Sequence, residues 1–242
     1  MAKVVILLSI GRNPASGRPR IARAEARAIE MALAGFNKND VVGLHAASET
    51  SPILREYLGL GLLSIIHVQT RAGEDPFPAL IERLREIGPD LVLCGQAAEA
   101  GLASGMVAYA CADALQSPVI ANVLSLTREG SDFLVVQGMG KGRHREMRGP
   151  SPVVLAVDAV QSSRRVPAMA NLRAGRIEVF PIVPGTIAGA TPSLDLRPAR
   201  VRPKKSVGGG GATTRGGAVE HLDPDSAAER ILNYLCNNKI IQ

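Results

Sequence analysis

The chain has 242 residues, 46% apolar and only 3% aromatic with no tryptophan, so its core is expected to consist mainly of Ala, Val, Leu and Ile. No apolar run approaches the length of a membrane span, and we therefore expect no membrane insertion. The formal net charge of +6 invites a nucleic-acid interpretation, but aromatic residues for base stacking are not interleaved with the basic ones, which favours a solvated basic surface or an acidic protein partner.

The first 126 residues alternate between predicted strands and helices. Mainly apolar runs predict strands at 3–10, 41–46, 62–68, 91–94 and 118–126, and the first two are expected to be buried. Apolar spacings of three and four, with breakers at their ends, predict helices near 21–35, from about Pro52, from Asp75-Pro76 to Ile87 and from about Ala103 to Leu115. This alternation is typical of the α/β class, with a doubly wound, mostly parallel sheet and helices on both faces.

The pattern changes from about Asp132. Short antiparallel strands are predicted at 133–136, 143–147 and 153–157. The glycine-rich stretch 138–142 resembles a phosphate loop, but a basic strand follows it instead of a helix, so a hairpin turn is the better interpretation. A polar, basic segment at 159–176 and a strand at 177–180 complete the expected domain of residues 1–180.

Residues 181–242 are expected to form an extended arm and a helix. Pro and Gly dominate from Pro181 to Gly217, which predicts an arm without secondary structure of its own. Asp223 and Pro224 then begin a last helix, which carries Ala228, Ile231, Leu232 and Leu235 on one side. An isolated amphipathic helix needs a surface to pack on, and the body of this chain and a second subunit remain equal alternatives.

Small residues follow three of the predicted parallel strands. Ser9, Ala46 and Gly95 stand at carboxyl ends of strands, and Gln96, Ser104 and Gly105 belong to the small-residue loop after the fourth strand. In doubly wound sheets ligands bind outside these ends, where backbone amides and helix N-termini face an anion. Small residues are also needed wherever a strand turns tightly into a helix. Their convergence on one edge favours a nucleotide-binding edge.

The remaining chemistry-bearing residues do not suggest catalysis or a metal site. The four histidines show no metal-ligand spacing, and no nucleophile has a base beside it in the pattern. Cys94 ends an apolar strand and is expected to be a packed thiol, and Asp158 a turn carboxylate. Three unclustered cysteines and the lack of a signal-peptide pattern predict a reduced, cytoplasmic protein.

The segment 159–176 carries exposed-looking apolar residues among arginines. Val166 and Met169 are flanked by Arg164, Arg165 and Arg173. An ordinary surface loop is one interpretation. An apolar spot bordered by charge is more typical of a protein interface, so we expect a docking loop here.

At this point the chain resembles the beta subunit of electron transfer flavoproteins, over roughly residues 3–180 with a weaker echo beyond. The matching pieces stand in the same order and at the same spacing: Ala28-Ile-Glu30-Met-Ala32, Leu58-Gly-Leu-Gly61, Ile66-His67-Val68, Asp75-Pro76, Pro89-Asp-Leu-Val-Leu-Cys-Gly, Ser104-Gly105, Pro152-Val-Val-Leu-Ala-Val157 and Ile177-Glu178-Val179. No single piece is decisive, whereas their order over so much of the chain is fairly specific.

The resemblance implies a non-catalytic subunit of an alpha/beta heterodimer that accepts electrons from a dehydrogenase and passes them to a membrane quinone reductase. The redox FAD would be held mainly by the alpha subunit, and the C-terminal helix would pack on that partner. The beta subunit would hold a structural AMP, or a second FAD in electron-bifurcating relatives, near Ser104, Gly105, Met106 and Val107. Val166, with Pro167 and Met169 beside it, falls at the apolar plug that enters the partner dehydrogenase.

The sequence departs from the family pattern at the nucleotide loop, at the first helix and at the plug. The segment Ala103–Met106 lacks the usual Asp, Thr and Gln, and Ala22-Arg23 stands where an Asn-Pro pair is usual. Two lost polar contacts would weaken nucleotide binding by roughly ten- to a hundredfold. Val166 is also shorter than the usual plug residue. A stand-alone adenine-nucleotide-binding sensor or stress-type domain, and nucleic-acid binding through the basic arm, remain the alternatives.

Overall fold

The computed structural model describes residues 3–101, 103–130, 132–181 and 222–238 of the chain. Residues up to 181 belong to one unit and 222–238 to a second, and each unit is described by itself. The predicted arm of 181–217 lies almost entirely outside the described residues.

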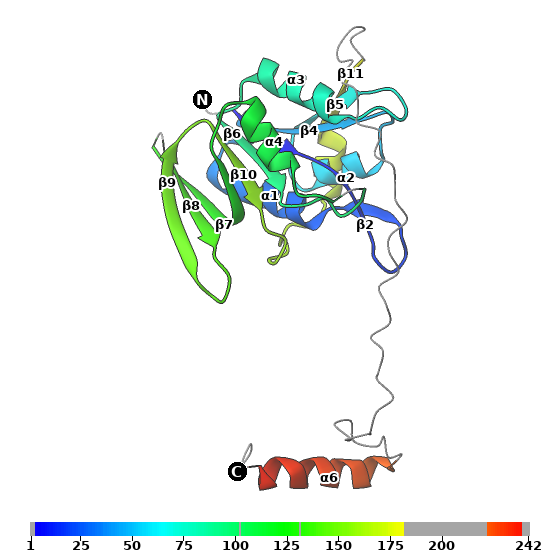
Figure 1. The fold of residues 1–242 in the computed structure, drawn as a ribbon. Coiled ribbons are helices and arrows are strands. Elements are labelled where there is room, and N and C mark those ends of the chain that lie inside the picture. The colour runs from blue at the N-terminus through cyan, green and yellow to red at the C-terminus, as the bar shows by residue number, and fades with distance from the viewer. Residues whose placement is uncertain (1–2, 102, 131, 182–221, 239–242) are drawn as a thin grey trace, which may run out of the picture. The chain divides into compact units, whose positions relative to one another are not determined.

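The first unit alternates strands with helices (Figure 1). Its strands are β1 (Val4–Leu7), β2 (Ile10–Arg12), β3 (Pro19–Ile21), β4 (Val41–Ala47), β5 (Ser64–Gln69), β6 (Leu91–Gly95), β7 (Val119–Glu129), β8 (Asp132–Gly138), β9 (His144–Pro150), β10 (Val153–Val157) and β11 (Arg176–Phe180). Its helices are α1 (Arg23–Gly35), the 3-10 turn η1 (Lys38–Asp40), α2 (Ile53–Gly59), α3 (Phe77–Ile87), α4 (Val107–Ala114) and α5 (Met169–Ala174).

The described residues form one nine-stranded sheet and one separate two-stranded ribbon. The strand order of the sheet is β11-β5-β4-β1-β6-β10-β7-β8-β9, and all pairs from β11 to β7 are parallel. The antiparallel ribbon pairs β2 with β3. The strand order turns outward in both directions from β1 and β6, so the topological switch point lies between their carboxyl ends. The α/β class and the mostly parallel sheet predicted from the sequence are confirmed.

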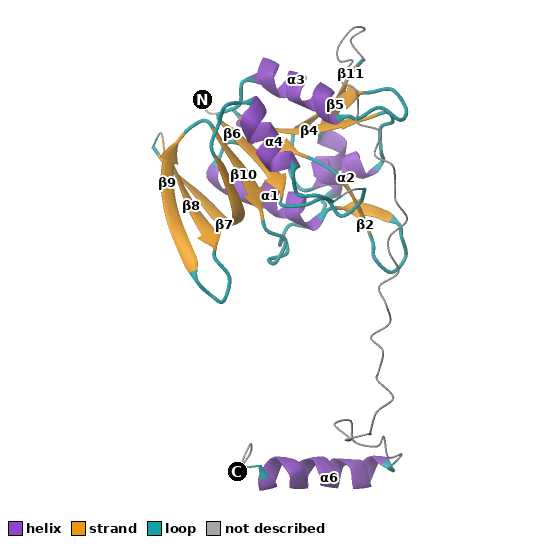
Figure 2. Ribbon diagram, in the orientation of Figure 1, coloured by secondary structure: helices purple, strands orange, loops and turns teal. Residues whose placement is uncertain are grey.

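Helices cover both faces of the sheet (Figure 2). On one face, Ile29 of α1 and Leu54 of α2 belong to one buried apolar cluster. On the other face, Leu84 of α3 and Cys111 of α4 belong to a second cluster. Successive residues of β1 point into the two clusters in turn, because side chains alternate along a strand. Burial on both faces explains why the central strands read as unbroken apolar runs.

The strand β10 corrects one prediction. It was expected to be an antiparallel strand of the extension, but it lies between β6 and β7 and is parallel to both. All five of its residues are buried, which is the property of a central parallel strand. The antiparallel part is the β8–β9 hairpin, as the hairpin interpretation predicted. In its turn the Met139 amide donates to the Arg143 carbonyl, and the Arg143 amide donates to the Gly140 carbonyl.

Several element boundaries also differ from the predictions. The expected strand at 3–10 is two strands, β1 and β2, and the segment 159–176 contains the short helix α5. Helix α4 begins at Val107 and not near Ala103, because Ala103 (φ 47°) and Gly105 (φ 71°) adopt left-handed backbone conformations that a helix excludes. Helix α3 begins one residue later than expected, with the Asp75 carboxylate accepting from the Phe77 amide.

The second unit contains helix α6 (Pro224–Asn237). The Asp223 carboxylate accepts hydrogen bonds from the backbone amides of Asp225 and Ser226, so the predicted N-cap is confirmed. The surface on which this helix packs stays a prediction. Within the described residues, none of the helices combines the length and the apolar character needed to cross a membrane.

Candidate functional site

The carboxyl ends of β1, β4 and β6 meet at one edge of the sheet, as the small-residue pattern predicted. The Leu8 amide donates to the Leu44 carbonyl (2.8 Å), and the Gln96 amide donates to the carbonyl of Val157 at the end of β10 (3.0 Å). The first turn of α1 packs directly on this edge, because a Cβ added to Gly95 would lie 2.9 Å from the Ala24 Cβ. The glycine therefore permits close packing of helix on strand.

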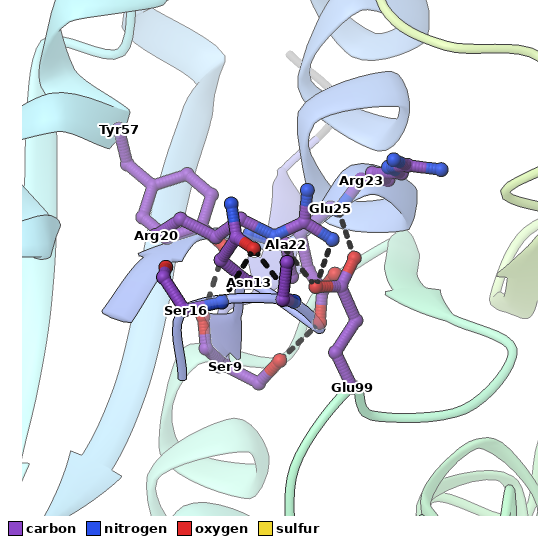
Figure 3. Close-up of polar contacts among 10 residues, drawn as sticks. Ser9, Asn13, Ser16, Arg20, Ala22, Arg23, Glu25, Tyr57 and Glu99 are labelled. Carbon is purple, nitrogen blue, oxygen red and sulfur yellow. Dashed lines mark hydrogen bonds and ion pairs between the residues drawn. The ribbon is translucent and has the colours of Figure 1, made fainter. Parts of the chain in front are cut away.

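Ser9 lies at this edge, but its hydroxyl and its carbonyl are already bonded within the protein (Figure 3). Its hydroxyl donates to the Glu25 carboxyl group at 2.5 Å, and its carbonyl accepts from the Tyr57 hydroxyl at 2.8 Å. The Tyr57 oxygen also accepts from the Ala22 amide at 2.9 Å. Tyr57 thus joins α2 to the end of β1 and to the residue before α1.

Glu25 is a buried carboxyl group in the first turn of α1, only 4% exposed. Burial raises its pKa to about 7, against the lowering effect of the Ser9 hydroxyl, and the nearby charge of Glu99 raises the pKa further. No cation forms an ion pair with it in the described part of the chain. The edge of the sheet therefore carries a carboxyl group, that of Glu25, which is mostly uncharged below neutral pH.

Glu99, in the loop after β6, places a second carboxyl group at the same edge (Figure 3). It accepts from Arg20 Nε and Nη2 at 3.2 and 2.8 Å, and from the Arg23 amide at 2.9 Å. Gly11 of β2 allows the approach, because a Cβ there would lie 2.7 Å from Glu99 Oε2. The carboxylate therefore stands at the N-terminus of α1, where the helix dipole favours negative charge.

The turn before α4 forms the other side of this edge. A Cβ on Gly105 would lie 3.0 Å from the Gln96 carbonyl oxygen, so the turn approaches the end of β6 closely. The Ser104 hydroxyl accepts from the Met106 amide at 3.3 Å. Ser104, Met106 and Val107 are exposed, with 58% and 41% of the last two accessible. This turn keeps a free surface beside the start of a helix.

The predicted nucleotide residues thus fall into three environments. Gly95, Gln96, Ser104 and Gly105 share one edge with the exposed Met106 and Val107. Ser9 reaches the same edge with its hydroxyl bonded to Glu25. Ala46 is 8% exposed and belongs to the apolar cluster under α3 and α4, so its side chain packs in the core.

The sequence interpretation missed Glu25, Glu99, Arg20 and Tyr57. One signal was available: Glu25 stands four residues after Ile21, inside the apolar stripe of the first helix, where a carboxyl group is out of place. Glu99 and Arg20 are 79 residues apart, and no sequence spacing predicts their contact.

The predicted docking loop is attached to α2. The Ala168 amide and the Asn171 side-chain amide both donate to the Gly59 carbonyl, at 3.0 and 3.2 Å. Pro167 packs on Gly59, where a Cβ would lie 2.8 Å from the proline Cβ. Val166 and Met169 remain 79% and 65% exposed. The loop therefore presents its two apolar side chains outward from a fixed backbone.

The buried thiols behave as the sequence predicted. Cys94 is buried and its sulfur lies 3.8 Å from the Leu155 carbonyl, and burial raises the pKa of the thiol strongly. Such a thiol is inert as a nucleophile at neutral pH. No cluster of three or more His, Cys, Asp or Glu residues that could hold a metal ion occurs in the part of the chain that the structure describes.

Comparison with known proteins gives two matches. A family model described as the electron transfer flavoprotein domain matches residues 16–183. The chain is also 28% identical to the electron transfer flavoprotein subunit beta of Chromohalobacter salexigens, over an alignment of 264 residues that covers 99% of this chain and 96% of that protein.

Proposed function

Since the chain belongs to the electron transfer flavoprotein family, we propose that it is the beta subunit of a heterodimeric electron carrier. The proposal is carried by the near-complete alignment with a protein named as such a beta subunit. In this role the chain has no substrate turnover of its own.

We propose that FAD, held mainly by the alpha subunit, accepts electrons from a donor dehydrogenase and passes them to a membrane quinone reductase. FAD supplies the redox chemistry when bound, because it can take up electron pairs and release them singly. In this proposal the described residues of this chain contribute the docking loop and the α/β domain that holds it. The complex would work in the cytoplasm.

We further propose that the edge formed by Gly95, Gln96 and the turn Ser104–Val107 holds AMP as a structural ligand. The fit is favourable there, because Gly105 leaves no Cβ between the turn and the Gln96 carbonyl and the first residues of α4 are exposed. Ser104 contributes a hydroxyl group, while backbone amides near the helix start would face the phosphate. The fit is poor at α1, where two carboxyl groups stand.

Purification of the complex tests this proposal. Co-expression with its alpha subunit should give a yellow heterodimer that releases one FAD and one AMP per complex on denaturation, as identified by mass spectrometry. Release of two FAD molecules per complex would mean that a second flavin, and not AMP, occupies the beta-subunit site, and would indicate electron bifurcation. A colourless monomer that binds ATP would instead support the sensor interpretation.

The docking loop gives a second test. Replacing Val166 with Asp should slow flavin reduction by the donor dehydrogenase about tenfold or more, because burying an exposed Val at an interface contributes about 1.5–3 kcal/mol and a charge opposes it. Stopped-flow mixing of the purified partners measures this rate, and dithionite reduction should stay unchanged.

Met139→Asp is the matched control for Val166→Asp. Met139 is also a partly exposed apolar residue (41%), but it lies in the β8–β9 turn. Equal slowing by both variants, or none by Val166→Asp, would remove the docking role from this loop. Arg164 and Arg173 are exposed beside it, so we expect the rate to fall with increasing salt if the partner surface is acidic.

A further inference from the structure

Helix α1 lacks a capping side chain of its own. Its N-cap residue is Ala22, which has no polar side chain and forms no side-chain cap. The first amides of a helix have no partner within the helix and need an acceptor from elsewhere. Two of these amides find acceptors on residues distant in sequence: the Ala22 amide donates to the Tyr57 hydroxyl, and the Arg23 amide donates to the Glu99 carboxylate.

The Glu99 carboxylate is held as a bound anion would be held. Arg20 contacts one of its oxygens through two nitrogens, and the helix amide of Arg23 contacts the other. The two side chains are partly shielded, with 29% of Arg20 and 22% of Glu99 exposed. Guanidinium and helix N-terminus are the two elements with which proteins commonly bind phosphate. Here both elements are bound to the chain's own carboxylate.

Glu25 also makes the start of α1 less favourable for an anion. It takes the Ser9 hydroxyl, the remaining side-chain donor at the end of β1. Its carboxyl group also lies 3.3 Å from the position of a Cβ on Gly95, so it stands directly at the end of β6. A phosphate dianion placed at α1 would face the charge of Glu99 and, above neutral pH, that of Glu25 as well.

We propose that Glu99 is the built-in anion of α1 and is a specificity-determining residue: it closes the α1 end of the edge to phosphate. A nucleotide phosphate can then be held only from the Ser104–Val107 side. The inference deepens the proposed function, because it concerns the AMP site assigned there. It also predicts that removing the Glu99 carboxylate opens a phosphate site built from Arg20 and the start of α1.

The test uses the heterodimer carrying Glu99→Ala, with inorganic phosphate as the probe and chloride at equal ionic strength as the reference. We expect saturating phosphate to raise the thermal midpoint of Glu99→Ala by about 2–5 °C more than that of the wild type. The double variant Arg20→Ala with Glu99→Ala should lose this gain. The Arg20-dependent part of the response is the measured quantity, since phosphate bound beside Ser104 does not involve Arg20.

A phosphate response of Glu99→Ala that persists without Arg20, or no response beyond that of the wild type, would overturn the proposal. If Glu99→Ala does not yield a folded complex, Glu99→Gln replaces it. Its amide oxygen can still accept from the Arg23 amide, while Arg20 loses its counter-charge, so a smaller Arg20-dependent response is expected. The proposed function fails separately: FAD and AMP contents of the wild type decide it, whatever the phosphate responses of the variants.

Discussion

Glu25→Gln is expected to stabilise the folded protein by up to about 3 kcal/mol above pH 7 and to have little effect near pH 4. The carboxyl group ionises near pH 4.5 in the unfolded chain and near pH 7 in the folded one, because folding buries it. Between these values the folded chain binds more protons than the unfolded chain, so stability falls as the pH rises and levels off above pH 7. Gln keeps an acceptor for the Ser9 hydroxyl without the charge.

Urea unfolding of the purified protein between pH 4 and 8.5 measures this effect as the difference between wild type and variant. The difference between the two proteins is needed because His45 and His67 change the stability with pH in the opposite direction to Glu25. They are buried and stacked on each other, and burial lowers the pKa of both, so they reduce stability as the pH falls below about 6.5. Glu56→Gln, an exposed glutamate on α2, is the control. A difference that does not change with pH would show that Glu25 is not the buried acid described above.

Tyr57→Phe is expected to lower the free energy of unfolding by about 2–4 kcal/mol. The hydroxyl accepts from the Ala22 amide and donates to the Ser9 carbonyl, and the tyrosine is fully buried. Its removal leaves two backbone groups without partners, each costing about 1–3 kcal/mol when buried. The phenyl ring of the variant still fills the space between α2 and the sheet, so the loss reports on the hydrogen bonds.

Tyr109→Phe provides the matched control. Tyr109 lies on α4 with 47% of its surface exposed, and the same substitution there should change stability by less than about 0.5 kcal/mol. Urea unfolding at one pH compares the two variants. Equal stabilities of wild type and Tyr57→Phe would mean that water or a shifted backbone satisfies Ala22 and Ser9, and that Tyr57 does not fix the start of α1.

Much of the fold could be predicted because its strands carry a local signal. β1 and β6 are unbroken apolar runs and β4 and β5 are mainly apolar. Helical spacings follow them in the sequence, and a parallel α/β sheet follows from that alternation. The placement of β10 could not be read in the same way, since pairing is a long-range property. Its unbroken apolar run, VVLAV, was the available clue, but its position after a polar hairpin favoured an antiparallel partner.

The candidate site was predictable only in outline. Glycine and serine at strand ends marked the right edge, because small residues are what a tight strand–helix turn requires. The carboxyl groups that fill the α1 end were not predictable, since Glu99 meets Arg23 across 76 residues and Glu25 meets Ser9 across 16. Conversely, Ala46 resembled the other small residues at strand ends in the sequence, but the structure places its side chain in the core.

The attachment of residues 166–171 to the last turn of α2 has a thermodynamic consequence. Two donors from this segment share the Gly59 carbonyl, and Arg165 adds a third bond to the Leu60 carbonyl at 3.2 Å. The segment is therefore preorganised, and little conformational entropy would be lost on docking of the proposed partner at Val166. Substitutions at that single position would then alter the choice of binding partner, while the rest of the domain keeps its own architecture.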